Sequence, residues 1–381
     1  MSRRTLLPIL FVLTFLLAFP LVAAETPEIA NNHKTVTVMT ENLYVGADLL
    51  PAFFAIASGE PDAIVAAVTE TFAKVRFTDF NARAEGIARQ IEAAQPDLVG
   101  LQEVSIWRSQ TPPDFVQGNA EHVEFDFLAI LLEALDARGL HYAVVAHEIG
   151  FDAEFPGFLS EAAVEAGELS DIRLTDGEAI LARTDLNVSE LKLSNARTGH
   201  FETNIEVPIS ETEIFVLLRG WASVDAKVRG KSFRFVTTHL ESESEEVREA
   251  QGLEILAGPA DTDLPVVFAA DANSNANGDS TTPAYAAFIG DGFVDAWFEA
   301  HPGSIVSTCC NAELLTNSTF VDPSEDFGRI DLVLYRAGTD FHTLGADLFG
   351  TNPATDRVSN GLTLIWPTDH AGVAATLQIQ N

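Results

Sequence analysis

The sequence predicts a layered α/β or α+β sandwich, because strand-like and helix-like apolar segments alternate along the chain. Hydrophobic residues make up 47% of the 381 residues and charged residues 20%, which is typical of a globular protein with a conventional core. After residue 34, neither an internal repeat nor a low-complexity linker interrupts the pattern. We therefore expect residues 35–381 to form a single domain.

Hydrophobic periodicity places the individual elements. Residues 35–39 are a β-branched run that predicts the first strand, and apolar residues recur at helical spacing from residue 79 until Pro96 ends that helix. Residues 97–102 predict a buried strand that delivers Glu103 to its carboxyl end. The remaining predicted elements are helices at 127–137 and 242–256, and strands at 141–146, 178–183, 214–224, 232–238, 265–270, 328–335 and 373–378.

The N-terminal segment has the pattern of a secretory signal peptide. Arg3 and Arg4 precede an apolar run over residues 6–21, and Val22-Ala23-Ala24 offers small residues for cleavage after Ala24. An uncleaved anchor helix is the alternative. We expect residues 1–24 to be a signal peptide and residues 25–34 a flexible lead-in, so the protein is expected to be secreted or periplasmic.

Charge and cysteine content limit the possible functions. With 56 acidic and 22 basic side chains, the formal net charge is −34, so overall charge cannot hold duplex DNA and a phosphate needs a local basic or metal-centred site. The two cysteines, Cys309 and Cys310, are adjacent, which excludes a disulfide scaffold. A bond between them and a pair of free thiols are both compatible with the sequence.

Polar residues stand at the ends of the apolar strands. One such residue is usually a cap or a turn, but a set of residue types suited to a hard cation and a phosphate indicates a site where loops converge. The strand-end residues are Asn42, Glu103, His239, Asp271 with Asn273, and Asp331; Asp369 and His370 precede the final strand.

The order and spacing of these motifs resemble the endonuclease/exonuclease/phosphatase superfamily, the DNase-I-like fold. The motifs are Thr40-Glu41-Asn42, Leu101-Gln102-Glu103-Val104, Thr237-Thr238-His239-Leu240, Asp271-Ala272-Asn273, Gly328-Arg329-Ile330-Asp331 and Thr368-Asp369-His370. The resemblance spans about Val36 to Leu377 and implies an α+β fold, a four-layer α/β/β/α sandwich with two mostly antiparallel, mixed sheets.

The chain departs from the family pattern at three points. Ala270-Asp271-Ala272-Asn273 replaces the usual Gly-Asp-Phe-Asn, and Thr368 stands where Ser is usual. The mid-chain Tyr that many members carry in the site has no evident counterpart.

The resemblance also implies a role for each motif residue. Glu103 would be the principal ligand of Mg²⁺ (or Mn²⁺ or Ca²⁺), with Asn42 beside it and Asp369 contributing. Asp271 and Asn273 would position the attacking water and a phosphate oxygen. His239 and His370 would donate hydrogen bonds to the phosphate oxygens in the transition state, with Asp331 orienting His370 and favouring its charged form.

The resemblance does not identify the substrate, because proteins with this fold act on different phosphoesters. A secreted, metal-dependent phosphoesterase of nuclease type, attacking in line with an activated water, is the first hypothesis. Since the chain has only five lysines, a lipid-headgroup phosphodiesterase of sphingomyelinase type is the alternative, with Trp107, Phe115, Trp297 and Phe298 as candidate contacts. A non-catalytic phosphate-binding module on the same fold is a third possibility. No stable protein partner is implied.

Overall fold

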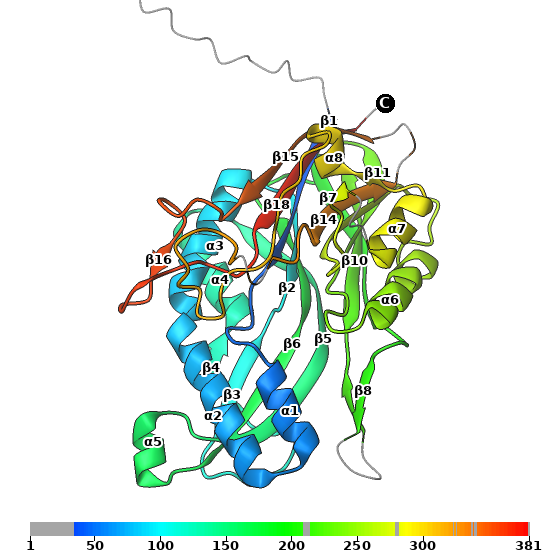
Figure 1. The fold of residues 1–381 in the computed structure, drawn as a ribbon. Helices are drawn as coiled ribbons and strands as arrows, with labels where there is room; N and C mark the ends of the chain where they lie inside the picture. Colours follow the sequence, from blue (N-terminus) through cyan, green and yellow to red (C-terminus); the bar gives the residue numbers. More distant parts are fainter. Residues whose placement is uncertain are drawn as a thin grey trace, which may run out of the picture. The chain divides into compact units, whose positions relative to one another are not determined.

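Two β-sheets form the centre of the computed structural model (Figure 1). The structure describes residues 34–208, 214–278, 282–322, 324, 326–336, 338 and 341–379; the predicted signal peptide and most of the lead-in lie outside them. The first sheet has the strand order β15-β18-β1-β2-β6-β3-β4, with β5 also paired to β6. Its strands are β1 (Lys34–Asn42), β2 (Leu98–Gln102), β3 (Ile106–Gln110), β4 (His122–Asp126), β5 (Tyr142–Gly157), β6 (Ser170–Arg183), β15 (Phe341–Phe349) and β18 (Gly372–Ile379).

The second sheet has the order β13-β14-β12-β11-β10-β7. Its strands are β7 (Leu191–His200), β10 (Gly220–Val228), β11 (Lys231–Thr238), β12 (Val266–Asp271), β13 (Val294–Asp295) and β14 (Asp331–Arg336). Two small hairpins lie outside both sheets, β8 (Ile205–Pro208) with β9 (Ile214–Leu217), and β16 (Val358–Ser359) with β17 (Leu364–Ile365).

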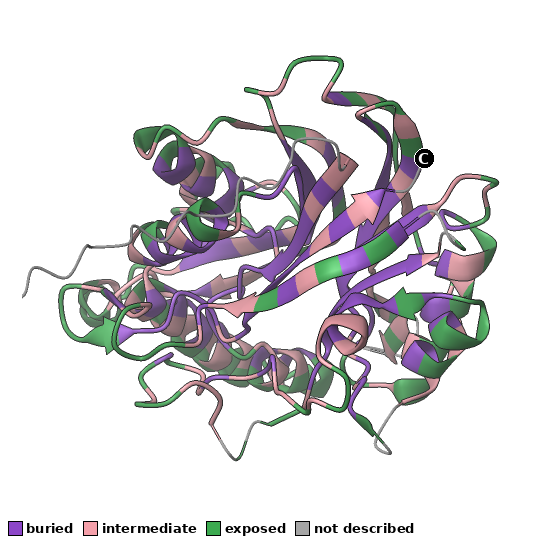
Figure 2. Cartoon of the chain, turned by 90° about the horizontal axis from the view of Figure 1, so that it is seen from above, coloured by how far each residue is buried: buried purple, intermediate pink, exposed green. Residues whose placement is uncertain are grey.

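Helices cover the outer face of each sheet, which makes four layers. The helices are α1 (Leu50–Ser58), α2 (Pro61–Thr78), α3 (Phe80–Ala94), α4 (Phe127–Ala137), α5 (Glu161–Ala166), α6 (Glu245–Ala257), α7 (Pro283–Gly290) and α8 (Ala296–Ala300). Side chains of α2, α3 and α4 pack on the first sheet, and those of α6 and α7 pack on the second. A third hydrophobic cluster fills the space between the sheets, and Figure 2 shows buried strands between helices with exposed outer faces. The predicted four-layer sandwich is confirmed.

Close packing of the sheets explains a glycine in β2. A Cβ on Gly100 would lie 2.4 Å from Thr237 Oγ1 of β11 and 2.7 Å from the Ala269 carbonyl oxygen of β12. Beside it, Gln102 of β2 donates to Thr237 Oγ1 at 2.8 Å and accepts from Thr40 at 3.0 Å. A small residue and a polar pair therefore hold the sheets together beneath their carboxyl ends.

Most predicted elements lie where the periodicity places them, with two exceptions. The run 214–224, predicted as one strand, is divided into β9 and β10, because the chain turns at 218–219 to enter the second sheet. The strand predicted over 328–335 begins only at Asp331, so Asp331 opens β14 and does not end an apolar strand. None of the described helices is long and apolar enough to cross a bilayer.

Candidate active site

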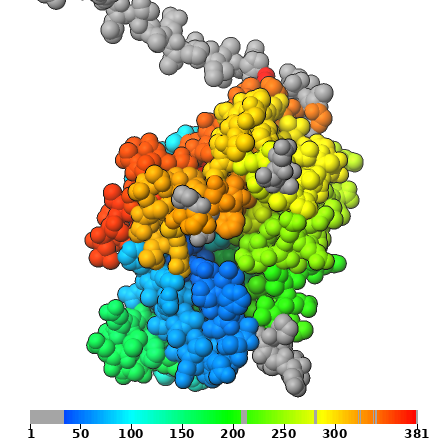
Figure 3. Space-filling model, in the orientation of Figure 1, coloured from blue at the N-terminus to red at the C-terminus, as the bar shows by residue number. Residues whose placement is uncertain are grey.

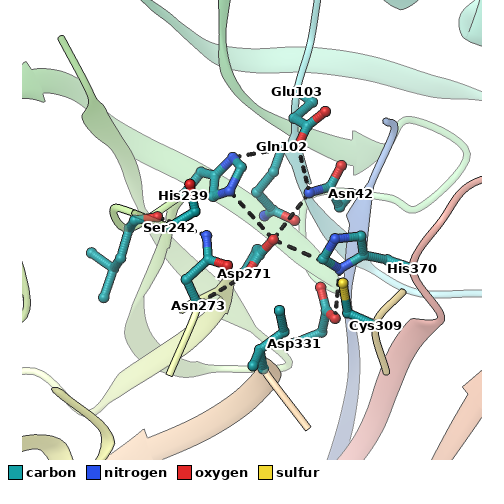
Figure 4. A network of polar contacts seen from close by, with 12 residues as sticks. Asn42, Gln102, Glu103, His239, Ser242, Asp271, Asn273, Cys309, Asp331 and His370 are labelled. Carbon is teal, nitrogen blue, oxygen red and sulfur yellow. Dashed lines mark hydrogen bonds and ion pairs between the residues drawn. The ribbon is translucent and has the colours of Figure 1, made fainter. Parts of the chain in front are cut away.

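The predicted site residues meet at one edge of the sandwich because of strand direction. β1 and β2 are parallel, as are β11 and β12, so Asn42, Glu103, His239 and Asp271 all follow carboxyl ends. β18 is antiparallel to β1, and β14 is antiparallel to β12, with Asp331 opposite Asp271. The starts of those two strands therefore lie at the same edge, and Figure 4 shows side chains from distant chain segments pointing toward one another.

Asn42 links the two sheets at this edge. Its Nδ2 donates to Glu103 Oε1 at 3.1 Å and to Asp271 Oδ2 at 3.0 Å, while its Oδ1 accepts the backbone N–H of Tyr44 at 2.8 Å. The second oxygen of Glu103 accepts the N–H of Val45. The amide nitrogen of Asn42 therefore faces the carboxylates, and it positions both of them.

His239 lies between the same two carboxylates. Its Nδ1 is 4.0 Å from Glu103 Oε1, and its Nε2 is 3.4 Å from Asp271 Oδ2. Burial lowers the pKa of His239 well below its usual range, and the neighbouring charges of Arg219 and His370 lower it further. His239 is thus neutral at pH 7 and can offer one N–H.

His370 has the opposite electrostatic setting. Its Nδ1 is 2.9 Å from Asp331 Oδ2 and 3.7 Å from Asp271 Oδ2. Burial by itself would lower the pKa of His370, but the carboxylates of Asp331, Asp369 and Asp271 outweigh burial and hold the pKa well above its usual range. The imidazole is therefore a buried cation at neutral pH, as predicted for a histidine paired with Asp331.

Arg329, two residues before Asp331 in the chain, pairs with a different carboxylate. Its guanidinium is fully buried and forms a two-pronged ion pair with Asp295, with Nη2 2.5 Å from Oδ2. Asp331 is left to His370, and its Oδ1 is buried with no hydrogen-bond partner among the described residues.

Asp271, Asn273 and Asp369 complete the set. Burial, followed by the charge of Asp331, raises the pKa of Asp271 to about 6. The Asn273 N–H donates to Asp271 Oδ1 at 2.9 Å, and its side chain donates to the Leu240 carbonyl oxygen. Asp369 Oδ1 lies 3.9 Å from His370 Nε2, and burial raises the pKa of Asp369 to about 7.

The departures from the family pattern leave this geometry intact. Ala270 and Ala272 are fully buried in the cluster beneath α6 and α7. Thr368 keeps the hydroxyl that a serine would supply, because its Oγ1 donates to the Asn42 carbonyl oxygen at 2.7 Å.

Comparison with known proteins agrees with the fold and the motifs. The model of the endonuclease/exonuclease/phosphatase family matches residues 72–370. The chain belongs to this family. No curated protein matches it.

Two solved structures of the family share the fold at low sequence identity, and a third structure is similar at a lower score. A family protein from Bacteroides thetaiotaomicron is 17% identical over 92% of this chain and 99% of its own, with a TM-score of 0.50. One from Bacteroides vulgatus is 16% identical over 91% and 99%, also with a TM-score of 0.50. TDP2 from Caenorhabditis elegans is 17% identical over 90% and 97%, with a TM-score of 0.46.

Enzymes of the endonuclease/exonuclease/phosphatase family typically use divalent metal ions, and the donors here fit one. Glu103, Asp271 and Asp369 offer hard oxygen atoms. Burial is the main cause of the raised pKa values of Asp271 and Asp369, and neighbouring carboxylates, Asp331 and Glu103 respectively, raise them further. Asp271, Asp331 and His370 have ligand atoms that all lie within 4.8 Å of one another. The structure thus offers a second possible ligand group beside the predicted set of Glu103, Asn42 and Asp369, whose role stays a prediction.

A cavity of about 520 Å³ opens over these residues, and Figure 3 shows a hollow between the blue, green and orange segments. Its walls differ in character. One set of lining residues is apolar, and another is strongly acidic with two arginines. The apolar residues are Leu49, Leu50, Phe53, Phe151, Leu217, Leu218 and Phe327; the charged ones beyond the motifs are Asp48, Glu148, Asp176, Glu178, Glu241, Glu243, Arg219 and Arg248.

The acidic residues of the cavity lining carry no signal in the sequence that marks them as part of a site. Asp176 accepts from Ser105 at 2.7 Å, and burial, followed by the charge of Glu103, raises the pKa of Asp176 to about 7. Glu178 is also buried, and burial together with its neighbour Glu148 raises its pKa well above the usual range. These residues follow an ordinary strand pattern in sequence, so only the pairing of β5 with β6 reveals the cluster.

Sequence reasoning also did not identify Arg83, which is fully buried on α3. It donates to the carbonyl oxygens of Leu43, Tyr44, Thr78 and Pro367, so it joins the loop after Asn42 to the loop before Asp369. A charged residue among the apolar positions of the helix was the available signal.

The four aromatic residues considered as lipid contacts lie away from the cavity. Trp107 and Trp297 are buried in hydrophobic clusters, Phe298 packs on Arg329, and Phe115 is exposed on the loop between β3 and β4. None of them lines the cavity as the described residues define it. Of the four tyrosines, all described, only Tyr44 lines it, so the family's mid-chain Tyr has no counterpart.

Cys309 and Cys310 are joined as a disulfide at the cavity's edge. The backbone of this segment pairs with the loop that carries Asp369 and His370: Asn311 N–H donates to the Asp369 carbonyl at 2.8 Å, and Ala371 N–H to the Thr308 carbonyl at 2.8 Å. The segment thereby joins the loop of His370 to the start of β14, since Thr308 Oγ1 also accepts the N–H of Asp331 at 3.1 Å.

Proposed function

We propose that this protein is a divalent-cation-dependent phosphoester hydrolase that attacks phosphorus in line with an activated water. The observation that carries the proposal is a neutral His239 and a cationic His370 on either side of Asp271, with Glu103 beside them. Such an arrangement places donors around a phosphate and a proton acceptor next to it.

Each residue then has a defined task. Asp271, whose pKa is about 6, accepts the proton of the attacking water, which Asn273 helps to orient. His370 donates to a non-bridging oxygen as charge develops, and Asp331 keeps it charged. His239 donates a second hydrogen bond. Glu103 and Asp369 would bind the cation, Mg²⁺ or a similar ion, while Asn42 positions Glu103 through its amide nitrogen. The cation would act as a Lewis acid and stabilise the leaving group.

The first experiment follows hydrolysis of bis(p-nitrophenyl) phosphate by the purified protein, with Mg²⁺ and with a chelator. Glu103→Gln and His370→Gln should each lower kcat/KM by at least about 100-fold. Glu246→Gln, an exposed acid on the outer face of α6, is the matched control and should keep the wild-type rate. Full activity in either site variant would refute the assignment, and phosphate binding without turnover would favour a binding module.

The charge of the cavity favours a small substrate over a long nucleic acid. Its described lining holds two arginines and no lysine against nine carboxylates, and tracking a DNA backbone needs several cationic contacts. Plasmid DNA should therefore be cleaved more slowly than a small diester, and strongly salt-dependent DNA cleavage would contradict this view.

The apolar part of the cavity lining favours a second candidate, a lipid-headgroup phosphodiesterase. Leu49, Phe53 and Leu217 line the same cavity as the motif residues and can contact an apolar leaving group. Sphingomyelin and inositol phosphates, each with and without chelator, would separate these substrate classes. Export through the predicted signal peptide is part of the proposal, and a mature N-terminus at Glu25 in the culture medium or periplasm would support it.

A further inference from the structure

A second group of carboxylates lies outside the cavity, beneath the loop of residues 111–121 that joins β3 to β4. Glu154 of β5 and Asp171 of β6 are both almost fully buried, and Asp114 of the loop lies over them. Each of the three offers a carboxylate oxygen, and these oxygens all lie within 4.8 Å of one another. Asp171 is five residues along β6 from Asp176, or roughly 17 Å from the cavity wall.

The sheet register explains why the two buried acids meet. Glu154 is opposite Arg173, and Asp171 is two residues from Arg173, so all three side chains point to the same face. On that face the loop crosses β5 and β6. The cluster is therefore fixed by two strands and does not depend on the loop alone.

One oxygen atom of each buried carboxylate accepts hydrogen bonds from the backbone of the loop. Asp171 Oδ2 accepts the N–H groups of Asp114 and Phe115 at 2.8 and 3.0 Å. Glu154 Oε2 accepts the N–H groups of Asn119 and Ala120 at 2.8 and 3.0 Å. The other oxygen of Glu154, Oε1, and Oδ1 of Asn119 are buried without a hydrogen-bond partner among the described residues.

Arg173 lies opposite Glu154, and the two charges attract, but the hydrogen bonds of Arg173 go to other groups. Arg173 is committed to Asp152 through two hydrogen bonds of 2.7 and 2.6 Å, and its remaining contact is with the Ala120 carbonyl oxygen at 3.5 Å. One guanidinium shared in this way leaves the cluster with excess negative charge, which is costly where it is buried, and a bound cation removes that cost. The cluster therefore lacks a positive charge that several of its oxygen atoms can coordinate at once.

We propose that this cluster is a calcium site, distinct from the catalytic centre, with Glu154 Oε1, Asp171, Asp114 and Asn119 Oδ1 as protein ligands. All four donors are oxygen atoms, which excludes a preference for zinc or copper. Calcium bonds of 2.3–2.6 Å let two ligand oxygens lie up to about 5 Å apart, whereas Mg²⁺ requires a tighter octahedron and retains its waters. The ion would bind the β3–β4 loop to the face of β5 and β6, so its expected effect is on stability.

The test measures calcium binding in excess Mg²⁺, which occupies the catalytic centre. Equilibrium dialysis of chelator-stripped protein should give one Ca²⁺ per chain for the wild type and for Glu103→Gln, and none for Glu154→Gln. The glutamine can still accept the two loop N–H groups, so that variant should fold. Calcium at about 100 times its Kd should raise the wild-type Tm by about 4 °C or more, and Glu154→Gln should lose this shift.

Two further variants keep the proposal testable if a buried substitution impairs folding. Asp114→Asn changes only an exposed ligand and should weaken Ca²⁺ binding at least about tenfold, while Asp185→Asn, an exposed acid beyond the other end of β6, should leave it unchanged. Chymotrypsin should cut after exposed Phe115 more slowly with Ca²⁺ present. The proposal would be overturned if the wild type bound no Ca²⁺ at millimolar concentration. It would also be overturned if Asp114→Asn and Glu154→Gln bound Ca²⁺ as tightly as the wild type.

Discussion

Replacing Asp331 by Asn tests the electrostatic basis of the site. The carboxylate is buried 2.9 Å from His370 Nδ1, and it is the chief group that holds the pKa of His370 above its usual range against burial. A buried hydrogen bond to a charged group contributes about 1.5–3 kcal/mol, which corresponds to a fall of about one to two pH units in the pKa of His370. In Asp331→Asn, His370 therefore loses its positive charge at a lower pH than in the wild type.

The assay is the pH profile of kcat/KM on a small phosphodiester. Activity that requires charged His370 falls as pH rises through its pKa, so in Asp331→Asn the alkaline limb should move down by about one to two pH units. At a pH above both pKa values the rate should be lower by about 10- to 100-fold. The loss of stability should be small, because His370 can release its proton when its partner is removed, and loss of the Asp331 charge relieves a repulsion on Asp271.

Asp295→Asn provides the comparison, since Asp295 is a buried carboxylate that pairs with Arg329. Leaving that guanidinium unpaired should lower the free energy of unfolding by about 3 kcal/mol or more, with a much smaller change in rate. An unchanged alkaline limb in Asp331→Asn, or a loss of stability equal to that of Asp295→Asn, would refute the reasoning about His370.

Three further predictions concern stability. Arg83→Met should leave buried carbonyl oxygens without a donor and lower the free energy of unfolding by about 3 kcal/mol or more in urea titrations; wild-type stability would show that water replaces the guanidinium. Gly100→Ala should cost about 1–3 kcal/mol by forcing a Cβ against Thr237, whereas Gly290→Ala, which meets nothing within 4 Å, is the control. In the presence of chelator, the protein should lose stability as pH rises from about 4 to 7, because the carboxyl of Asp176, with its pKa of about 7, binds its proton more tightly in the folded state than in the unfolded state. Mg²⁺ should reduce this dependence of stability on pH. A Tm that rises between about pH 4 and 7 in chelator would contradict the prediction.

Local pattern was sufficient where a segment's own side chains determine its structure. The helix predicted over 127–137 is α4 with the same bounds, because its apolar stripe and the Asp126 cap are encoded within the segment. The run 214–224 was predicted wrongly, since no local signal marks the point at which a strand leaves one sheet for another. The positions of Asn42, Glu103, His239 and His370 in one cluster followed from the resemblance and from strand ends, and their catalytic roles stay predictions.

The sequence by itself determined the layered fold, the ordered polar motifs and the acidic character of the chain. Only the tertiary structure decided which charges face one another: Asp331 pairs with His370 while Arg329 pairs with Asp295, and Glu148, Glu154, Asp171 and Glu178 become buried. The physical reason is that a charged side chain's pKa and ligands depend on neighbours brought by sheet pairing, some of them more than 200 residues away in the chain, as Asn42 and Asp271 are.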